Sequence, residues 1–251
     1  MKILLLDIEI SPTMGVFWGL FNQNLSIQNI LGNSEVLCWS AKWLGDDTVF
    51  FSSKQKASKR RMLTTIYKLL AAADAVVTYN GNSFDLKILN KEFALLGFGP
   101  PAPYKSIDLL AVMRKRFRFT SNKLGYVTEQ LGLGEKTPHN GMQLWLDCMN
   151  PKSTDYASSW ATMEKYNIND VILLEQLYEK VKGWIHNHPN LSLESEAICC
   201  PNCGSHDVQR RGYATTAVGK YARYVCKSCG KWSKQRTLKE PAEGAKLVGI
   251  I

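Results

Sequence analysis

The chain has 251 residues, which is enough for one large domain or for a medium domain followed by a small one. Its composition, 45% hydrophobic and 21% charged, is that of a globular protein with a sizeable core. Residues 1–198 carry 21 basic and 19 acidic side chains, whereas residues 199–251 carry 10 and 3. A near-neutral body with a strongly basic tail predicts a polyanionic partner that contacts the tail.

Hydrophobicity gives no sign of a membrane protein. The opening apolar run is too short to span a bilayer, and Asp7 and Glu9 interrupt it, which argues against a signal peptide. Four of the seven cysteines form two C-x-x-C pairs, a pattern that favours metal binding in a reducing compartment over a disulfide framework. We therefore expect a cytoplasmic protein with no membrane partner.

In chain order, the first half is expected to alternate strands and helices. Strands are predicted over residues 1–10, 35–44 and 48–53, the last two joined by a turn at 45–47. A helix over residues 59–73, a strand over 75–79 and a helix over 84–96 follow, the last ended by Gly97. Residues 107–117 are expected to begin as a strand and finish as a helix, and Ser121 to cap a helix over 123–131.

The second half is expected to hold one long helix and a separate small module. Residues 134–153 are polar and predicted to be turn-rich, although Trp145 and Leu146 could be packed. A long helix is predicted over residues 158–185. Strands followed by alternating helix and strand predict an α/β fold, with a mixed sheet flanked by helices. The predicted domains are residues 1–189, a linker over 190–198, and a second domain over 199–251.

Two acids close the first strand. Asp7 and Glu9 stand two residues apart, so their side chains point to the same face of a strand that is otherwise apolar. Buried carboxylates that share a face repel each other and lose hydration, which makes the pair costly without a cation. Because Mg²⁺ prefers oxygen ligands, the pair is interpreted as half of a metal site.

Two later segments supply the expected remainder of this site. Asn80 and Asn82 lie between the predicted strand 75–79 and the next helix, and Asp85 lies in the first turn of that helix. This position is typical of the ligand-binding edge of an α/β sheet. Tyr166 and Asp170 are four residues apart in the long helix and therefore share one of its faces.

Together these residues resemble a known family. Asp7-x-Glu9, Asn80-x-x-x-Phe84-Asp85 and Tyr166-x-x-x-Asp170 resemble the three motifs of the DEDD, or DnaQ-like, 3′–5′ exonucleases, which have an RNase H-like fold. A Tyr four residues before the last Asp resembles the tyrosine subclass. The histidine subclass has His one position earlier, where this chain has Lys165.

The resemblance implies hydrolysis by a two-metal mechanism. Asp7, Glu9, Asp85 and Asp170 are expected to bind two Mg²⁺ or Mn²⁺ ions, with Asp7 bridging them. Tyr166 is expected to orient the water and the scissile phosphate rather than to act as a base, since its ordinary pKa is about 10. Substrate contacts are expected from Asn80, Asn82 and Phe84. Asp108, a further acid, is interpreted as a structural residue such as a helix cap.

The C-terminal cysteines resemble the two knuckles of a zinc ribbon. Cys200 with Cys203 and Cys226 with Cys229 offer four thiolates, the ligand set of one closed structural Zn²⁺ site. Cys199 is an alternative to Cys200, which we prefer because it has the C-x-x-C spacing. A domain this small lacks a firm core, so zinc is expected to supply its folding energy. Cys38 and Cys148 are expected to be buried as small apolar residues.

Basic and aromatic residues alternate around the predicted ribbon. Cations bind phosphates and aromatic rings stack on bases, so this surface predicts nucleic-acid binding. A solvated surface or a protein-docking module is the alternative. The basic cluster of residues 114–118 in the body could guide a strand or simply end a helix. The predicted substrate contacts of the ribbon are Arg210, Arg211, Arg223 and Lys231.

The leading hypothesis is a metal-dependent 3′–5′ exonuclease of DNA or RNA whose zinc ribbon aids binding. Single-stranded or 3′-ended DNA is the expected substrate, and a polymerase or another replication or recombination protein is a candidate partner. The alternatives are a structure-specific endonuclease on the same fold and a non-catalytic nucleic-acid-binding or polymerase-docking module. The size and arrangement of the chain also resemble small phage-encoded exonucleases with a zinc-ribbon tail.

Overall fold

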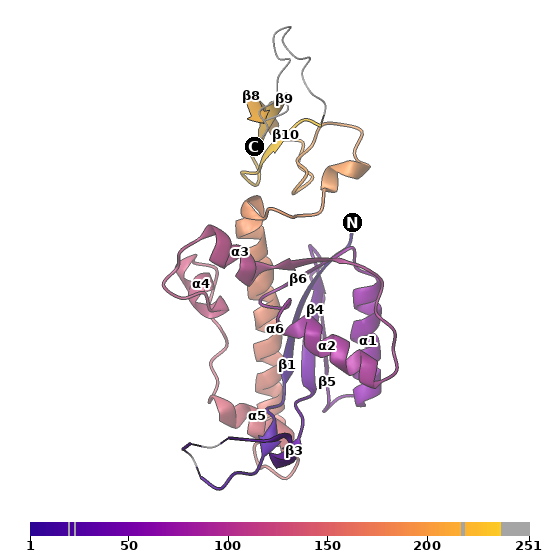
Figure 1. Ribbon diagram of the computed structural model, residues 1–251, viewed down its shortest axis with the longest axis vertical. Helices are drawn as coiled ribbons and strands as arrows, with labels where there is room; N and C mark the ends of the chain where they lie inside the picture. Colours follow the sequence, from indigo (N-terminus) through magenta and orange to yellow (C-terminus); the bar gives the residue numbers. More distant parts are fainter. Residues whose placement is uncertain (20, 23, 217–218, 237–251) are drawn as a thin grey trace. The chain divides into compact units, whose positions relative to one another are not determined.

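The structure is a computed structural model that describes residues 1–19, 21–22, 24–216 and 219–236. It divides into two compact units, Met1–Leu177 and Tyr178–Ile251 (Figure 1). The domain boundaries expected at residues 189 and 199 stay a prediction, and the part of the predicted basic tail beyond Arg236 lies outside the described residues. Among those residues, none of the helices combines the length and apolar character that crossing a bilayer requires.

A five-stranded mixed sheet forms the centre of the first unit, in the order β5-β4-β1-β6-β7. β1 pairs antiparallel with β4 and parallel with β6, so the N-terminal strand lies in the middle of the sheet. This confirms the predicted α/β fold with a mixed sheet. The strands are β1 (Ile3–Ile10), β4 (Val36–Trp43), β5 (Val49–Ser53), β6 (Ala75–Thr78) and β7 (Lys105–Asp108).

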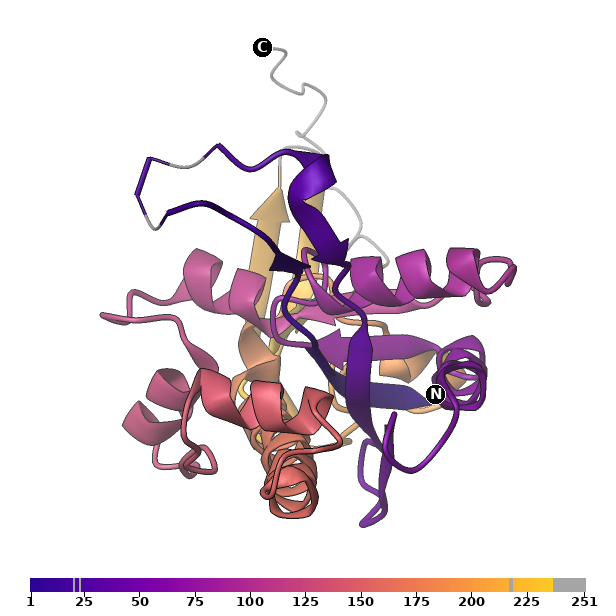
Figure 2. The same cartoon turned by 90° about the horizontal axis from the view of Figure 1, so that it is seen from below.

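Helices cover both faces of this sheet (Figure 2). On one face, α1 (Lys59–Ala71) and α2 (Asp85–Leu95) bury a core that includes Leu4, Leu6 and Ile8. On the other, α5 (Met142–Met149) and α6 (Tyr156–Val181) pack on β4. Side chains alternate along a strand, so Asp7 and Glu9 point away from the first core and toward α6.

Local sequence signals explain where several helices begin. Ser58 caps α1 by accepting a hydrogen bond from the Arg61 amide. Asp108 accepts bonds from two amides of the first turn of α3 (Leu109–Arg116), which confirms its interpretation as a helix cap. The predicted cap at Ser121 is wrong, because α4 (Leu124–Gln130) begins after Lys123 and has no side-chain cap.

The segment expected to be turn-rich contains a helix. α5 buries Leu144 and Cys148, which are four residues apart and share one helical face. Glycine and proline on both sides hide this short amphipathic run in the sequence. The predicted long helix ends at Val181, four residues early, and continues as the short 3-10 helix η2 (Lys182–Trp184). A second 3-10 turn, η3 (Leu191–Glu194), lies within the predicted linker.

The sequence predicted no structure for residues 11–34, and the described residues of this segment contain a separate hairpin. Its short strands β2 (Met14–Gly15) and β3 (Ile30–Gly32) pair antiparallel, with the 3-10 turn η1 (Ile27–Asn29) before β3. We call this segment the uncharged hairpin, since residues 11–34 contain no Asp, Glu, Lys or Arg.

The second unit contains a three-stranded antiparallel sheet in the order β10-β9-β8. Gly204 and Gly230 follow the two C-x-x-C pairs with φ of 72° and 73°, a conformation in which glycine is favoured. The sheet with its two cysteine turns is the arrangement predicted for a zinc ribbon. The strands are β8 (Val208–Thr216), β9 (Gly219–Cys226) and β10 (Trp232–Lys234).

Candidate active site

Three of the predicted acids meet at the centre of the first unit. One carboxylate oxygen from each of Asp7, Glu9 and Asp170 lies within 4.8 Å of the other two. Asp7 and Glu9 come from the central strand β1, and Asp170 comes from α6, which crosses that face of the sheet. The two acids that are two residues apart on β1 and the acid on α6 therefore bring their carboxylates to the same place.

A buried asparagine fixes α6 against the strands. Asn167 accepts a hydrogen bond from the Ser40 hydroxyl on β4 and donates one to Asp7 Oδ2, each 2.7 Å long. The side chain is fully buried, so both bonds are protected from water. Asn167 thereby fixes the position of α6 along β1, so that Asp170, three residues later, lies beside Asp7.

Asp85 lies beside the cluster but is held by the main chain. It is in the first turn of α2, and its Oδ1 accepts a hydrogen bond of 3.1 Å from the amide of Ile8. This amide is available because the parallel pairing of β1 with β6 ends at Leu5. Among the described residues, Asp85 is not one of the acids whose oxygens meet within 4.8 Å.

Burial and mutual repulsion shift the titration of these acids. Burial, reinforced by Asp85, Asp170 and Glu9, raises the pKa of Asp7 well above its ordinary value. Burial is also the main reason that the pKa of Glu9 is raised to about 8 and that of Asp85 to about 7. Without added positive charge, the site holds protons that exposed carboxylates release.

A lysine that the sequence analysis missed lies in the site. Lys136, between α4 and α5, places its Nζ 2.6 Å from Asp170 Oδ2 and 3.0 Å from the Tyr166 hydroxyl. Burial opposes its charge, but Asp170 and Tyr166 raise the pKa of Lys136 above its ordinary value. Burial and the charge of Asp170 raise the pKa of Tyr166 to about 12. At neutral pH the Lys136 side chain is thus an ammonium and Tyr166 a neutral phenol.

Two aromatic residues that were also missed line the same site. Trp145 of α5 lies close enough to Glu9 to lower the pKa of that acid slightly, against the larger effect of burial. The His139 ring packs edge-on between Trp145 and Tyr166, with centroid distances of 5.2 and 5.0 Å. No spacing rule in the sequence connects these residues with the acids, because the loop before α5 brings them there.

The donor set fits hard divalent cations. Asp170 Oδ1 is buried and has no hydrogen-bond partner among the described residues. This oxygen is therefore available to bind a cation. Three carboxylates that converge within 4.8 Å present only oxygen donors and a strongly negative potential. This chemistry suits Mg²⁺ or Mn²⁺.

The predicted substrate contacts near Asp85 belong to a tightly held turn. Asn80 adopts a positive φ of 74°, and the amides of Asn80 and Asn82 donate to Asp108. The side-chain oxygen of Asn82 accepts a bond from Ser106. Phe84 is 36% exposed immediately before Asp85. A role for these three residues in substrate binding stays a prediction.

The second unit brings its four paired cysteines together. The sulfur atoms of Cys200, Cys203, Cys226 and Cys229 all lie within 4.8 Å of one another, and two pairs are 3.6 Å apart. A tetrahedral ZnS₄ site with bonds of about 2.3 Å has S–S edges of about 3.8 Å, so the group matches a closed zinc site. Cys199 is buried outside this group.

Backbone amides donate hydrogen bonds to two of these cysteines, Cys226 and Cys200, whereas burial raises the pKa of Cys203 and Cys229. Although burial acts against it, amides of Cys229 and Ser228 lower the pKa of Cys226 to about 7. The sulfur of Cys200 accepts a bond from the Asn202 amide. Thiolates surrounded by amide donors are typical of zinc knuckles, and they bind the ion more tightly than thiols do.

The strands of this unit carry cations stacked on aromatic rings. Arg210 and Lys220 lie over Tyr213, at 5.2 and 4.7 Å from the ring centre, and Arg223 lies over Trp232 at 4.8 Å. Lys231 instead donates to the carbonyl of Ile185. Arg211 is exposed. The basic and aromatic residues predicted to alternate therefore share one sheet, while their contacts with substrate stay a prediction.

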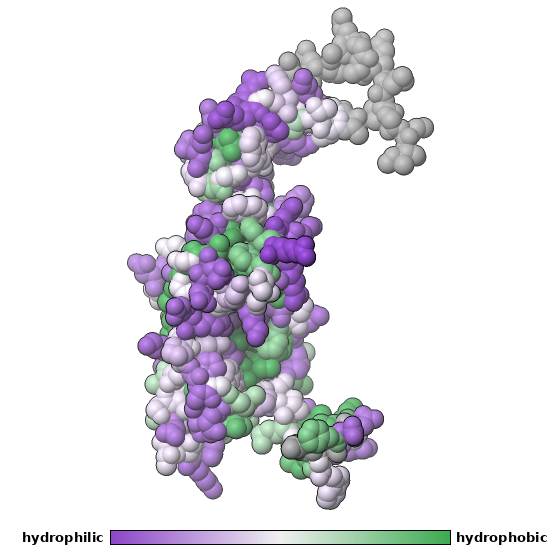
Figure 3. All heavy atoms as spheres, turned by 90° about the vertical axis from the view of Figure 1, so that its left-hand side faces the viewer, coloured by the Kyte–Doolittle hydropathy of each residue, from purple (hydrophilic) through white to green (hydrophobic). Residues whose placement is uncertain are grey.

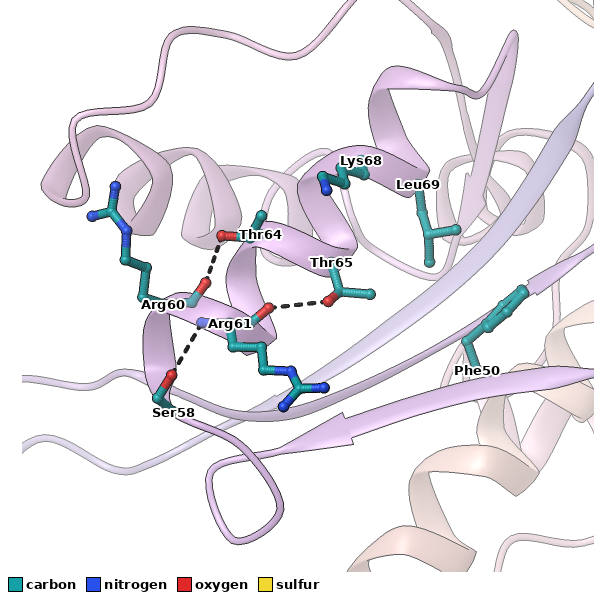
Figure 4. Close-up of a pocket in the computed structure, with 8 residues that line it drawn as sticks. All are labelled: Phe50, Ser58, Arg60, Arg61, Thr64, Thr65, Lys68 and Leu69. Atoms are coloured by element: carbon teal, nitrogen blue, oxygen red, sulfur yellow. Dashed lines mark hydrogen bonds between the residues drawn. The ribbon is translucent and has the colours of Figure 1, made fainter.

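A separate pocket of about 640 Å³ lies along α1, on the face of the sheet opposite α6 (Figure 4). Arg60, Arg61 and Lys68 give it a basic character. The hydroxyls of Thr64 and Thr65 donate to carbonyls of their own helix, so their donor capacity is already used. The acids of the candidate site do not line this pocket.

The raised pKa values predict an unusual pH dependence. In protein freed of Mg²⁺ and Mn²⁺, the free energy of unfolding should rise as the pH falls from 8 to 6. Glu9 and Asp85 have folded-state pKa values of about 8 and 7, above the value of about 4 expected in an unfolded chain, so the folded state binds more protons across this window. Thermal unfolding followed by circular dichroism tests this. The variant Glu9→Gln should show a flatter dependence, and a melting temperature that increases from pH 6 to pH 8 would contradict the prediction.

The comparisons with known proteins agree with the fold. No curated protein sequence matches the chain. Among solved structures, the family B DNA polymerase from the hyperthermophilic archaeon Pyrobaculum calidifontis matches with a TM-score of 0.56 and 17% identity. The match covers 72% of this chain and 24% of the polymerase chain, so this protein spans about a quarter of that polymerase. At this identity the likeness concerns the fold alone.

The sequence itself matches a family over most of the first unit. The profile of the RNase H superfamily matches residues 33–182, which include β4, the Asp85 turn and α6 with Tyr166 and Asp170. The strand β1 with Asp7 and Glu9 lies before the matched region and pairs with β4 and β6 in the structure. The chain belongs to the RNase H superfamily.

Proposed function

We propose that this protein is a metal-dependent 3′–5′ exonuclease of the DEDD tyrosine subclass, which hydrolyses phosphodiester bonds of DNA or RNA. The observation that carries the proposal is the convergence of Asp7, Glu9 and Asp170 within 4.8 Å, with Tyr166 one helical turn before Asp170. Membership of the RNase H superfamily supports a nuclease in general. The direction of cleavage and the two-metal mechanism rest on the resemblance of the three motifs.

In this proposal Asp7, Glu9, Asp85 and Asp170 hold two Mg²⁺ or Mn²⁺ ions. When bound, these ions supply an activated water and stabilise charge on the leaving oxygen. Tyr166 stays protonated and donates a hydrogen bond to the water or the phosphate. Lys136 orients both Tyr166 and Asp170, and Asn167 orients Asp7.

We propose that the second unit binds one structural Zn²⁺ through Cys200, Cys203, Cys226 and Cys229. Its stacked cations are then available to bind the phosphates of a nucleic acid. Thiolate ligands persist in a reducing compartment, which suits the cytoplasm. A polymerase or another replication or recombination protein is the proposed protein partner.

An assay with end-labelled nucleic acid tests the function. The protein is incubated with 5′-labelled single-stranded DNA, and in parallel RNA, in the presence of Mg²⁺ or Mn²⁺. A ladder of progressively shorter labelled products is expected from cleavage at the 3′ end. A few discrete internal cuts would instead identify an endonuclease. Absence of products with both nucleic acids and both ions, at high protein concentration, would exclude nuclease activity.

The variant Lys136→Met tests the residue that the motifs do not include. It removes the two hydrogen bonds that hold Tyr166 and Asp170, so kcat should fall by about 10², with a much smaller change in KM. Lys87→Met, which changes an exposed lysine of α2, is the matched control and should behave like the wild type. A kcat for Lys136→Met within about twofold of the wild type would remove Lys136 from the mechanism.

A further inference from the structure

The uncharged hairpin is a defined element that the fold of the first unit does not use. Its base is fixed by two hydrogen bonds between Ser11 and Glu35, of 2.9 and 3.0 Å, and Val16 bonds to Asn29 within it. None of its exposed apolar side chains belongs to the buried cluster around Leu4 and Leu6 or to the one around Leu37 and Cys38. The profile match to the RNase H superfamily begins only at residue 33.

This hairpin exposes an unusual amount of apolar surface. Trp18 is fully exposed, and Ile27 and Phe21 are 87% and 82% exposed. Figure 3 shows apolar surface gathered on the segment that projects at the lower end of the first unit. Contiguous exposed apolar surface of this kind generally marks an interaction site. The other exposed apolar side chains of the hairpin are Met14, Val16, Phe17, Leu25, Ile30 and Leu31.

The hairpin begins at the rim of the candidate active site. A pocket of about 420 Å³ is lined by Thr13 and Ser34 at its base together with His139, Met142 and Trp145. The rings of His139 and Trp145 both pack edge-on against Tyr166, with centroid distances of 5.0 and 6.1 Å. A substrate bound at the acids therefore has the base of the hairpin within its immediate surroundings.

We propose that the uncharged hairpin binds unpaired bases of the nucleic-acid substrate beside the cleavage site. This inference rests on the proposed nuclease function and adds a surface that would bind the bases of the substrate. Phe17, Trp18 and Phe21 offer rings on which bases stack, and the exposed Asn22 and Asn24 can form hydrogen bonds with base edges.

The absence of charged residues in 11–34 indicates which part of a nucleic acid the hairpin binds. Without Lys or Arg the hairpin has no groups that bind phosphates strongly, and without Asp or Glu it does not repel a polyanion. It therefore suits bases rather than the backbone. In a duplex the faces of the bases are covered by stacking, so only a strand with unpaired bases presents them. The hairpin thus favours single strands and frayed ends over intact duplex.

The test compares aromatic with aliphatic substitutions in the same hairpin. The combined variant Phe17→Ala, Trp18→Ala and Phe21→Ala is expected to weaken binding of a short single-stranded oligonucleotide at least about tenfold. Binding to a blunt duplex of the same sequence should change less than twofold. The matched control, Leu25→Ala with Ile27→Ala and Leu31→Ala, removes aliphatic surface that is equally exposed and should leave single-strand binding nearly unchanged. Fluorescence of 2-aminopurine placed near the 3′ end reports stacking directly, in buffer without Mg²⁺ or Mn²⁺.

The outcomes separate this inference from the proposed function. Bis(p-nitrophenyl) phosphate carries no base, so the aromatic variant should hydrolyse it like the wild type. If the wild type cleaves neither this ester nor any nucleic acid, the proposed function fails, while the binding comparison still tests the hairpin. Equal single-strand binding by the wild type and the aromatic variant would overturn the inference. So would a wild type that sediments as a dimer while either variant sediments as a monomer, since a second copy would then cover the hairpin.

Discussion

The variant Asp7→Asn should lower the rate of phosphodiester hydrolysis by about 10³-fold or more and leave the protein folded. Asp7 is the acid most surrounded by others, with Glu9, Asp85 and Asp170 all acting on its pKa. Replacing it by a neutral amide removes one of the proposed metal ligands at the centre of the cluster. Metal ions contribute several kcal/mol of charge stabilisation in such reactions, and about 4 kcal/mol corresponds to about 10³ in rate.

The same substitution separates catalysis from stability. A buried carboxylate among like charges destabilises the metal-free fold, so Asp7→Asn should melt at the same temperature as the wild type or higher when Mg²⁺ and Mn²⁺ are absent. Asp74→Asn is the matched control, because Asp74 is an exposed acid outside the cluster whose side chain accepts a hydrogen bond from the Lys2 amide. Initial rates with single-stranded substrate and thermal unfolding are measured on both variants. Turnover of Asp7→Asn within tenfold of the wild type would refute the assignment of Asp7.

The variant Cys226→Ser should abolish zinc binding and unfold the three-stranded sheet of the second unit. The sulfur of Cys226 lies 3.6 Å from that of Cys203, and its pKa of about 7 makes it the thiol most readily deprotonated for a cation. Binding of structural zinc by such small modules contributes roughly 10 kcal/mol or more to folding at neutral pH. The sheet has few buried apolar residues of its own, so other interactions do not replace that contribution.

Cys199→Ser provides the matched control for this prediction. Cys199 is adjacent to a cysteine of the cluster and equally buried, yet it lies outside the group of four sulfurs. The control should retain about one zinc per chain, whereas Cys226→Ser should retain almost none. Elemental analysis measures the zinc content, and the dispersion of amide chemical shifts in NMR spectra reports whether the sheet is folded. Zinc loss from Cys199→Ser but not from Cys226→Ser would reverse the ligand assignment.

The periodic features of the sequence predicted most of the fold. Strand β1 and helices α1 and α6 carry apolar residues at the spacing of their elements, so their positions were correct within a few residues. The α5 helix was not predicted, because its eight residues lie between turn-forming segments and only its tertiary contacts stabilise it. The uncharged hairpin was not predicted, because its sequence has neither helical nor strand periodicity.

The acids of the site were predictable from the sequence, whereas the residues that surround them were not. Asp7, Glu9 and Asp170 lie in elements whose spacing fixes the face on which each acid lies. Lys136 and His139 lie in the loop between α4 and α5, where the position of a side chain depends on contacts distant in the sequence. Asn167 was visible beside Tyr166, but its role depends on Ser40 of another strand, which pairwise spacing does not reveal.

The bond between Lys136 and Asp170 has a consequence for how the protein folds. Carboxylates that faced one another without any positive charge would repel each other and oppose the packing of α6 on the sheet. Lys136 supplies one positive charge from within the chain and leaves Asp170 Oδ1 without a hydrogen-bond partner among the described residues. The chain thus carries part of the charge compensation that its acidic centre requires, so we expect the metal-free protein to fold.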